Sequence, residues 1–180
     1  MAFQQGTAQA TGLPGDWADA VLERALIHHL PESELEVVFR ESRRILKPGG
    51  VLIVQDRTPE DCVLPGSREH LRGCCFEVFP RLIPLETGRR HSASAVLQAL
   101  EKAGFGQVEE VKLWETRKRY AGWSEFRTEL LGRAGRSILH ELSDEELVRL
   151  AKEIELRYAF QEKEEIAEKD RWTVWFAKVR

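Results

Sequence analysis

Hydrophobic and polar positions in the first third of the chain predict a strand, a helix and a second strand. Ala18-Asp19-Ala20-Val21-Leu22 is a short apolar run typical of a buried strand. After Pro31 the apolar side chains recur at helical spacing, at Leu35, Val38, Phe39, Ile45 and Leu46. Val51 to Val54 is apolar on both faces, as expected for a central parallel strand covered by helices. Together they predict a βαβ unit.

The boundaries of this helix also have sequence signals. Ser33 and Glu36 form a capping-box pattern, in which each side chain bonds a backbone N–H at the helix start. Lys47-Pro48-Gly49-Gly50 predicts the end, because Pro48 cannot continue a helix and glycine adopts the left-handed conformation that closes one.

The second half of the chain predicts one more helix and two strands around an insertion. A helix begins near Ser92 or Ser94 and ends at Gly104, and an alternating strand follows over 107–114. Residues 172–179 are rich in aromatic and β-branched side chains, which favours a strand. Between these strands, residues 115–171 predict a helical insertion: one helix including Trp123, Phe126, Leu130, Ala134 and Ile138, and another with a capping box at Ser143.

Composition excludes several classes of protein. The 180 residues carry a net charge of −3, so no basic footprint for nucleic acid is present. No apolar run approaches the roughly 18 residues of a membrane span, and the N-terminus has no secretory signal. The cysteines, Cys62, Cys74 and Cys75, lack metal-ligand spacing and favour a reduced protein without a metal site. A cytoplasmic protein is therefore expected.

Several motifs in combination resemble the class I S-adenosylmethionine-dependent methyltransferases of the ubiquinone and menaquinone biosynthesis type. These motifs are Asp19-Ala20-Val21-Leu22, His28-His29-Leu30-Pro31, Leu46-Lys47-Pro48-Gly49-Gly50 and the helix that ends Ala103-Gly104-Phe105. The upstream Gly6-Thr7-Ala8 resembles the turn that reads Gly-Asp-Ala in this family. The resemblance covers residues 3–114 and the last strand.

The resemblance implies an α/β fold with a Rossmann-like, mostly parallel sheet, an antiparallel last strand and S-adenosylmethionine as cofactor. It assigns 1–114 and 172–180 to an incomplete methyltransferase domain and 115–171 to the helical insertion. It places Thr7 and Ala8 near the adenine, although Thr7 replaces the acidic residue usual there. The family's glycine-rich first turn and the acidic residue that holds the ribose should precede Phe3. The chain is thus expected to be incomplete, inactive alone and a weak cofactor binder.

Other site residues follow from their places beside the predicted strands. Ligands of open α/β sheets bind outside the carboxyl ends of the strands, which favours Arg24 and Ala25 as cofactor-lining residues. His28 is the candidate general base, with packing and loop capping as the alternative for the His28-His29 pair. Asp56 lies at a strand end and either approaches the substrate or is exposed, whereas Asp19 is expected to bond backbone N–H groups.

The long basic stretch after the second strand predicts a substrate cover. Its candidate substrate-binding residues form a cationic surface for an acidic or polar molecule: His70, Arg72, Arg89, Arg90 and His91. The alternative is solvated arginines near a helix start.

Two functions remain open: methyl transfer to a small organic molecule, or a non-catalytic binding or assembly module that retained the scaffold. We further expect self-association, because the family's first strand lies beside the strand containing Ala20-Val21-Leu22, whose edge would otherwise be open.

Overall fold

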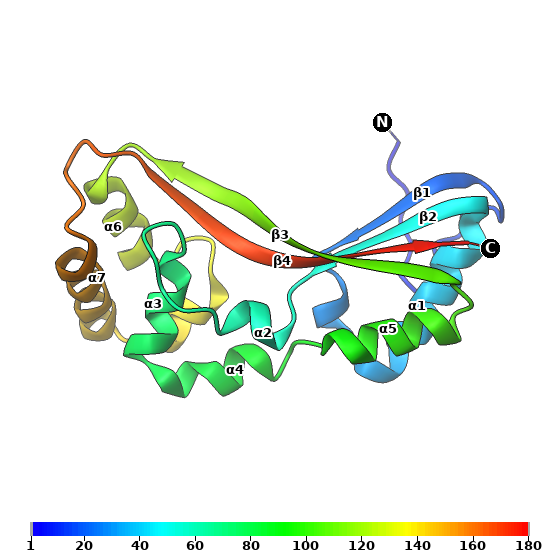
Figure 1. Cartoon of the computed structure of the whole chain (residues 1–180), viewed down its shortest axis with the longest axis horizontal. Helices are drawn as coiled ribbons and strands as arrows, with labels where there is room; N and C mark the ends of the chain where they lie inside the picture. Colours follow the sequence, from blue (N-terminus) through cyan, green and yellow to red (C-terminus); the bar gives the residue numbers. More distant parts are fainter. Residues whose placement is uncertain (1, 180) are drawn as a thin grey trace. The chain divides into compact units, whose positions relative to one another are not determined.

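The computed structural model describes residues 2–179, which divide into two compact units (Figure 1). Unit 1 comprises Met1–Thr58, Arg89–Leu113 and Trp172–Arg180, and unit 2 comprises Pro59–Gly88 and Trp114–Arg171. The elements are, in order, β1 (Ala18–Arg24), α1 (Glu32–Ile45), β2 (Leu46–Asp56), α2 (Pro59–Cys62), α3 (Leu71–Val78), α4 (Ile83–Thr87), α5 (Ala93–Lys102), β3 (Gln107–Tyr120), α6 (Trp123–Leu131), α7 (Asp144–Tyr158) and β4 (Ile166–Lys178).

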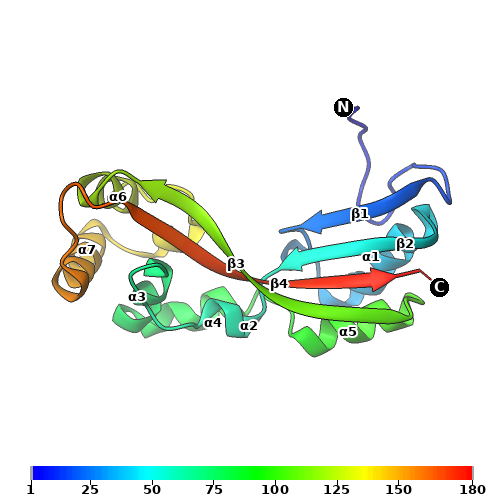
Figure 2. The same ribbon diagram turned by 45° about the horizontal axis from the view of Figure 1, so that its top comes forward.

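The described residues form a four-stranded sheet in the order β1-β2-β4-β3. β1 pairs in parallel with β2, with Val21 opposite Leu52, and β2 pairs antiparallel with β4, with Val54 opposite Trp175. β3 points in the direction of β1 and β2, so β4 is the antiparallel strand (Figure 2). The predicted α/β fold with a mostly parallel sheet and an antiparallel last strand is confirmed.

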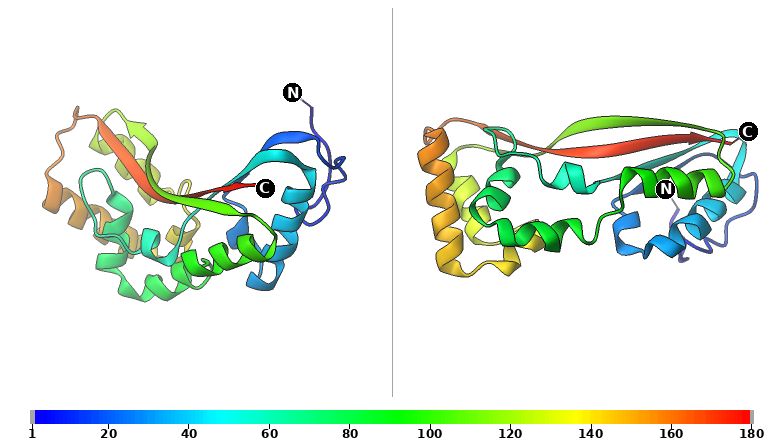
Figure 3. Two further views of the ribbon diagram at one scale, coloured as in Figure 1. Left: turned by 45° about the vertical axis from the view of Figure 1, so that its right-hand side comes forward. Right: turned by 60° about the horizontal axis from the view of Figure 1, so that its bottom comes forward.

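The core of unit 1 lies between the sheet and two helices. α1 and α5 cover the same face of the strands (Figure 3). The side chains that meet there are fully or almost fully buried: Leu35, Val38, Phe39, Leu52, Val54, Val96, Leu100, Trp175 and Ala177. The helical spacing of the apolar residues in α1 thus has the role that the sequence predicted, since it turns one stripe of the helix onto the sheet.

The start of α1 differs from the sequence prediction. Pro31 occupies the N-cap position with φ −64° and ψ 150°, and no side chain caps the helix there. Glu32 is already helical, so Ser33 lies inside the first turn and the predicted Ser33–Glu36 capping box is wrong. Proline at this point is compatible with a helix start because its fixed φ suits the first turn.

The segment Lys47-Pro48-Gly49-Gly50 ends the helix as predicted but belongs to β2. The register of β1 against β2 jumps there, from Ala18 opposite Leu46 to Ala20 opposite Val51. Gly49 has φ +78°, a conformation that costs little in glycine because it has no Cβ. The motif therefore makes a bulge in a long strand. Asp19 reaches this bulge with its carboxylate 2.8 Å from Lys47 Nζ, and no described hydrogen bond links that carboxylate to a backbone N–H, contrary to expectation.

Unit 2 has a second core, formed by α3, α6 and α7 with apolar residues between them. The Ser143 capping box of α7 is confirmed, with both reciprocal hydrogen bonds present. The single helix expected through Ile138 is wrong: α6 stops at Leu131, and a 3-10 turn covers Ser137–Glu141. Gly132 and Gly135 lie at this break, and Gly135 has φ +68°, outside the helical region.

The strands that flank the insertion are longer than predicted. β3 continues to Tyr120 and β4 begins at Ile166, so each contributes residues to both units. Residues 2–5 are in no strand, and β1 is an edge strand of the sheet. The outer edge of β1 therefore has no partner strand within residues 2–179. No helix in that part of the chain is long and apolar enough to cross a bilayer.

Candidate functional site

A sharp turn after β1 positions the histidine pair. β1 ends at Arg24, and Ala25 has φ 50°, a left-handed conformation that is uncommon for a residue with a Cβ. The Ala25 backbone N–H donates to Gln55 O at 2.9 Å, which ties the turn to the end of β2. The 3-10 turn Ile27–His29 follows directly. The strained residue therefore redirects the chain so that His28 meets the last residue of β2.

That last residue, Asp56, is the centre of a buried polar cluster. His28 Nδ1 lies 2.9 and 3.0 Å from the two carboxylate oxygens, and the His28 backbone N–H donates to Oδ2 at 3.3 Å. Arg90 Nη1 lies 3.2 Å from Oδ1, and the Arg57 backbone N–H donates to the same oxygen at 2.8 Å. Asp56 is only 1% exposed. We call His28, Asp56 and Arg90 the His28 cluster.

Electrostatics keep the Asp56 carboxylate ionised. Burial raises the pKa of Asp56, but the hydrogen bond from His28, the nearby charges and the Arg57 backbone N–H outweigh it and hold this pKa below its usual range. An ionised carboxylate facing Nδ1 favours the tautomer that has its proton on Nδ1. The His28 Nε2 atom then has a free lone pair, and no residue in 2–179 hydrogen-bonds it. This is the arrangement of an oriented general base.

Two further predicted residues support the same turn. His91 Nε2 lies 2.9 Å from Ile27 O and 3.0 Å from Leu30 O, so its ring holds both ends of the 3-10 turn. The His29 ring packs 4.0 Å from the His28 ring, centroid to centroid. His29 therefore packs against the neighbouring ring, whereas His28 also contacts the Asp56 carboxylate.

The predicted cofactor residues lie on two segments of unit 1. Thr7 and Ala10 form a small bridge, and this segment is held to α1 by Gln9 bonding Glu34 and by Thr11 bonding Glu41. Ala8 packs against the core of unit 1. Arg24 and Ala25 are at the end of β1, as the sequence indicated. The cofactor role of Thr7, Ala8, Arg24 and Ala25 remains a prediction.

The five predicted substrate residues do not form one exposed surface. Arg90 and His91 join the His28 cluster and its turn, and Arg89 is their neighbour in unit 1. His70 and Arg72 belong to unit 2 and are buried, at 2% and 5% exposure. Because His70 and Arg72 are buried, they are not part of a solvated surface. A charged side chain that is buried to this extent needs a partner of opposite charge or a hydrogen-bonding group.

The partners of these two buried residues are in unit 2. Arg72 Nη2 lies 2.7 Å from the Glu86 carboxylate, and His70 Nδ1 lies 2.9 Å from Lys169 O. Burial lowers the pKa of His70, which favours its neutral form. Cys62, Cys74 and Cys75 are free and buried in the same unit, consistent with reduced packing residues.

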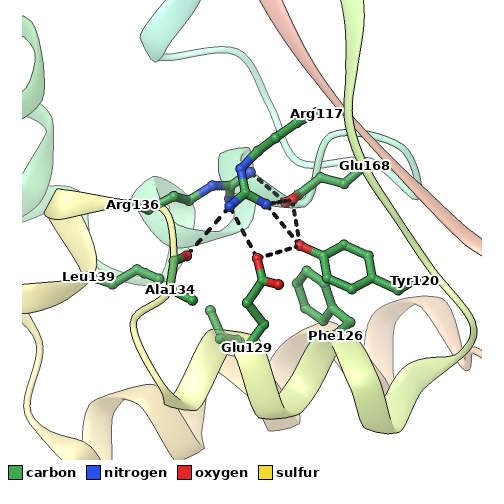
Figure 4. A pocket seen from close by; sticks show the side chains of 9 residues that line it. Arg117, Tyr120, Phe126, Glu129, Ala134, Arg136, Leu139 and Glu168 are labelled. Carbon is green, nitrogen blue, oxygen red and sulfur yellow. Dashed lines mark hydrogen bonds and ion pairs between the residues drawn. The ribbon is translucent and has the colours of Figure 1, made fainter.

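Unit 2 also has a small polar pocket, shown in Figure 4. Arg117 bonds Glu168 at 3.0 Å and Glu129 at 3.1 Å, and the Tyr120 hydroxyl donates to both carboxylates. Arg136 lies 2.5 Å from Glu168. The ion pairs of Arg117 in β3 connect it to Glu168 in β4 and Glu129 in α6. Because each charge has an opposite partner and the pairs join three elements of unit 2, we assign this network a structural role. No group of side chains within residues 2–179 has the composition of a metal site.

The sequence did not single out Gln55, near the carboxyl end of β2, or Trp172, at the start of the unit 1 part of β4. Arg57 Cζ lies 4.4 Å and Arg24 Cζ 5.4 Å from the centroid of the Trp172 ring. Trp172 fits the strand pattern of residues 172–179, and one aromatic residue in a strand has no further distinguishing signal. Its contacts with β1 and β2 depend on the strand order.

Comparison with known proteins gives three findings. Residues 1–54 match the methyltransferase domain family. Over 122 residues the chain is 32% identical to the uncharacterized methyltransferase YcgJ of Bacillus subtilis (strain 168), covering 67% of this chain and 44% of that protein. The fold is similar to a putative methyltransferase from an antibiotic biosynthesis pathway of Anabaena variabilis ATCC 29413, with TM-score 0.62 and 18% identity over 97% of this chain and 72% of that one. The chain thus spans less than half the length of YcgJ.

Proposed function

Because the chain belongs to the class I S-adenosylmethionine-dependent methyltransferases, we propose that it contributes to methyl transfer onto a small organic acceptor whose accepting atom bears a proton. The observation that supports this is the His28 cluster, with an oriented imidazole at the carboxyl end of β1. Ligands of open α/β sheets bind at this edge.

The residues of this chain supply orientation and proton removal. S-adenosylmethionine, when bound, would supply an electrophilic methyl group on a sulfonium centre, and the carbon–sulfur bond would break on transfer to leave a neutral thioether. His28 Nε2 accepts the proton of the acceptor as the new bond to carbon forms, and the ring becomes an imidazolium. Asp56 stabilises that positive charge through Nδ1, and Arg90 holds the carboxylate in place. The imidazolium afterwards returns its proton to water.

The residues present fit only part of the cofactor. Ala25, directly after β1 and beside the His28 turn, has a small side chain at the strand edge where the ligands of such sheets bind. A carboxylate usually holds the ribose hydroxyls of a nucleotide cofactor, and the two carboxyl groups near the ends of β1 and β2, Glu23 and Asp56, are both buried. Glu23 accepts a hydrogen bond from Ser42, and Asp56 is held by His28 and Arg90. We therefore propose that the described residues by themselves bind S-adenosylmethionine weakly.

Isotope transfer from methyl-labelled S-adenosylmethionine to a panel of phenols and amines tests the catalytic proposal. His28→Gln should lower kcat by about 10²–10⁴-fold, because it removes the proton acceptor. Asp56→Asn should act in the same direction, because it disfavours the required tautomer. His140→Gln, at an exposed histidine of unit 2, is the matched control and should leave the rate unchanged.

The outcomes separate the two candidate functions. Absence of methyl transfer at saturating cofactor would overturn the catalytic proposal and favour the non-catalytic binding or assembly module. Calorimetry tests the binding statement: a dissociation constant of about 1 µM or tighter, near −8 kcal/mol, would show that the residues present suffice to hold the cofactor.

A further inference from the structure

The 3-10 turn that carries His28 has little regular hydrogen bonding of its own. The His29 N–H donates to Leu26 O at 3.0 Å, and the Leu30 N–H donates to Ile27 O at the same distance. No side chain caps the start of this turn. Because 3-10 hydrogen bonds have poorer geometry than those of an α-helix, a single turn of this kind depends on contacts with other segments.

The side chain of His91 supplies such a contact at both ends of the turn. Its Nε2 lies 2.9 Å from Ile27 O and 3.0 Å from Leu30 O. Both partners are carbonyl oxygens, which only accept, so the imidazole must carry its proton on Nε2. One N–H thus points between two carbonyl groups that are three residues apart. The tautomer of His91 is therefore fixed by its partners.

His91 extends from a well-fixed part of unit 1. The next residue, Ser92, is the N-cap of α5, and its Oγ accepts from the Ala95 N–H at 3.1 Å. Val96 and Leu100 of the same helix are fully buried in the core of this unit. A side-chain cap and a buried face together fix the start of a helix. The Nε2 donor of His91 is consequently held on a rigid element.

The residue before His91 contacts the other half of the His28 cluster. Arg90 Nη1 lies 3.2 Å from Asp56 Oδ1, and the second oxygen of that carboxylate lies 2.9 Å from His28 Nδ1. Two consecutive side chains therefore hold the carboxylate and the turn that bears the imidazole. Such support matters because a reactive group is precise only when its neighbours lock its position.

We propose that His91 is a positioning residue, whose Nε2–H keeps the turn in the conformation that presents His28 Nδ1 to Asp56. The chemical purpose of this orientation rests on the proposed function. Without the donor the turn would relax and the His28 ring would separate from the carboxylate. The tautomer with its proton on His28 Nε2, which cannot accept another, would then become populated. His91 therefore acts through His28, whereas the sequence had placed it against the substrate.

Two variants separate the donor from the bulk of the His91 side chain. His91→Gln keeps an N–H donor near the place of Nε2, and His91→Leu keeps a side chain of comparable size without a donor. Long-range ¹H–¹⁵N NMR of the full chain without cofactor, above the titration range of histidine, reports the tautomer of His28. Amide hydrogen exchange at Leu30 reports opening of the turn.

In the wild-type chain we expect His28 in the form with its proton on Nδ1. His91→Leu should give a mixture of tautomers at His28 and speed exchange at Leu30 by about tenfold. His91→Gln should behave as the wild type. His140→Leu, at an exposed histidine of unit 2, is the matched control and should change neither signal.

An unchanged His28 tautomer in His91→Leu, or equal changes in His91→Leu and His91→Gln, would overturn the proposal. If His91→Leu does not fold, the wild-type chain decides: a His91 ring with its proton on Nδ1 and none on Nε2 would overturn the proposal equally, and a proton on Nε2 with wild-type behaviour of His91→Gln would support it.

The proposed function can fail separately from the positioning role of His91. Methyl transfer, where it is measured, should show kcat lowered about tenfold in His91→Leu with KM unchanged, because the acceptor does not touch His91. A fall in kcat/KM that comes only from KM would instead return His91 to the substrate and overturn its positioning role. Absence of methyl transfer in the wild type, with the expected NMR results, would contradict the catalysis and support the positioning of His28.

Discussion

Glu23 gives the most direct test of the packing between β1 and α1. This carboxyl group is 5% exposed, and its Oε1 accepts a hydrogen bond from Ser42 Oγ at 2.6 Å. The other oxygen, Oε2, has no partner among the described residues. Burial raises the pKa of Glu23 from 4.5 to about 7, and the Ser42 hydrogen bond offsets only part of that effect.

The elevated pKa makes unit 1 less stable as the pH rises. Below pH 4.5 the group is protonated in both the folded and the unfolded chain, so it adds no pH-dependent cost. Between pH 4.5 and 7 the unfolded chain releases this proton first, and the folded state loses stability until both forms are ionised. The interval between the two pKa values corresponds to about 3 kcal/mol, with each pH unit worth about 1.4 kcal/mol.

Glu23→Gln removes the ionisation but keeps an oxygen that accepts from Ser42. The free energy of unfolding of the variant minus that of the wild type should therefore increase by about 3 kcal/mol between about pH 4.5 and about pH 8. Urea unfolding followed by circular dichroism at several pH values measures this difference. Any constant offset from the new amide cancels in the comparison.

Glu101→Gln, at an exposed position of α5, is the matched control and should give an offset that does not change with pH. A pH-independent difference for Glu23→Gln would refute the reasoning. Carboxyl NMR that showed Glu23 titrating near its ordinary pKa of 4.5 would refute it equally, since burial would then not be controlling the ionisation of this group.

Two further predictions concern α7 and the edge of the sheet. Leu150→Ala should cost about 2–5 kcal/mol in urea unfolding, because Leu150 is 1% exposed in the core of unit 2. Leu156→Ala on the same helix, where the side chain is 69% exposed, should cost less than about 0.5 kcal/mol, and equal costs would contradict the assigned core. The unpaired edge of β1 is expected to mediate self-association, so Leu22→Lys should shift sedimentation towards the monomer while Val148→Lys does not. A wild-type chain that stays monomeric at high concentration would exclude this role for the edge.

Local patterns were sufficient for several elements. The helical spacing from Leu35 to Ile45, the apolar run Val51–Val54 and the Ser143 capping box each predicted a feature that the structure contains. These signals work because periodicity and capping depend on neighbours within one or two turns of the same segment. Ser33 shows the limit of such patterns: two N-terminal signals competed, and Pro31 took the cap position.

The candidate site required the tertiary structure. The sequence marked His28 as a base and left Asp56 open between two roles, but their contact joins residues 28 positions apart and recruits Arg90 from a third segment. The same holds for Gln55 and Trp172, whose neighbours depend on β4 pairing with β2. The sequence alone determined α1, α5, α7 and the cores of the four strands, but it missed α2, α3 and α4 and the break after α6. Only the order and register of the strands decided which of their ends face one another, because contacts between distant segments depend on how the whole sheet assembles.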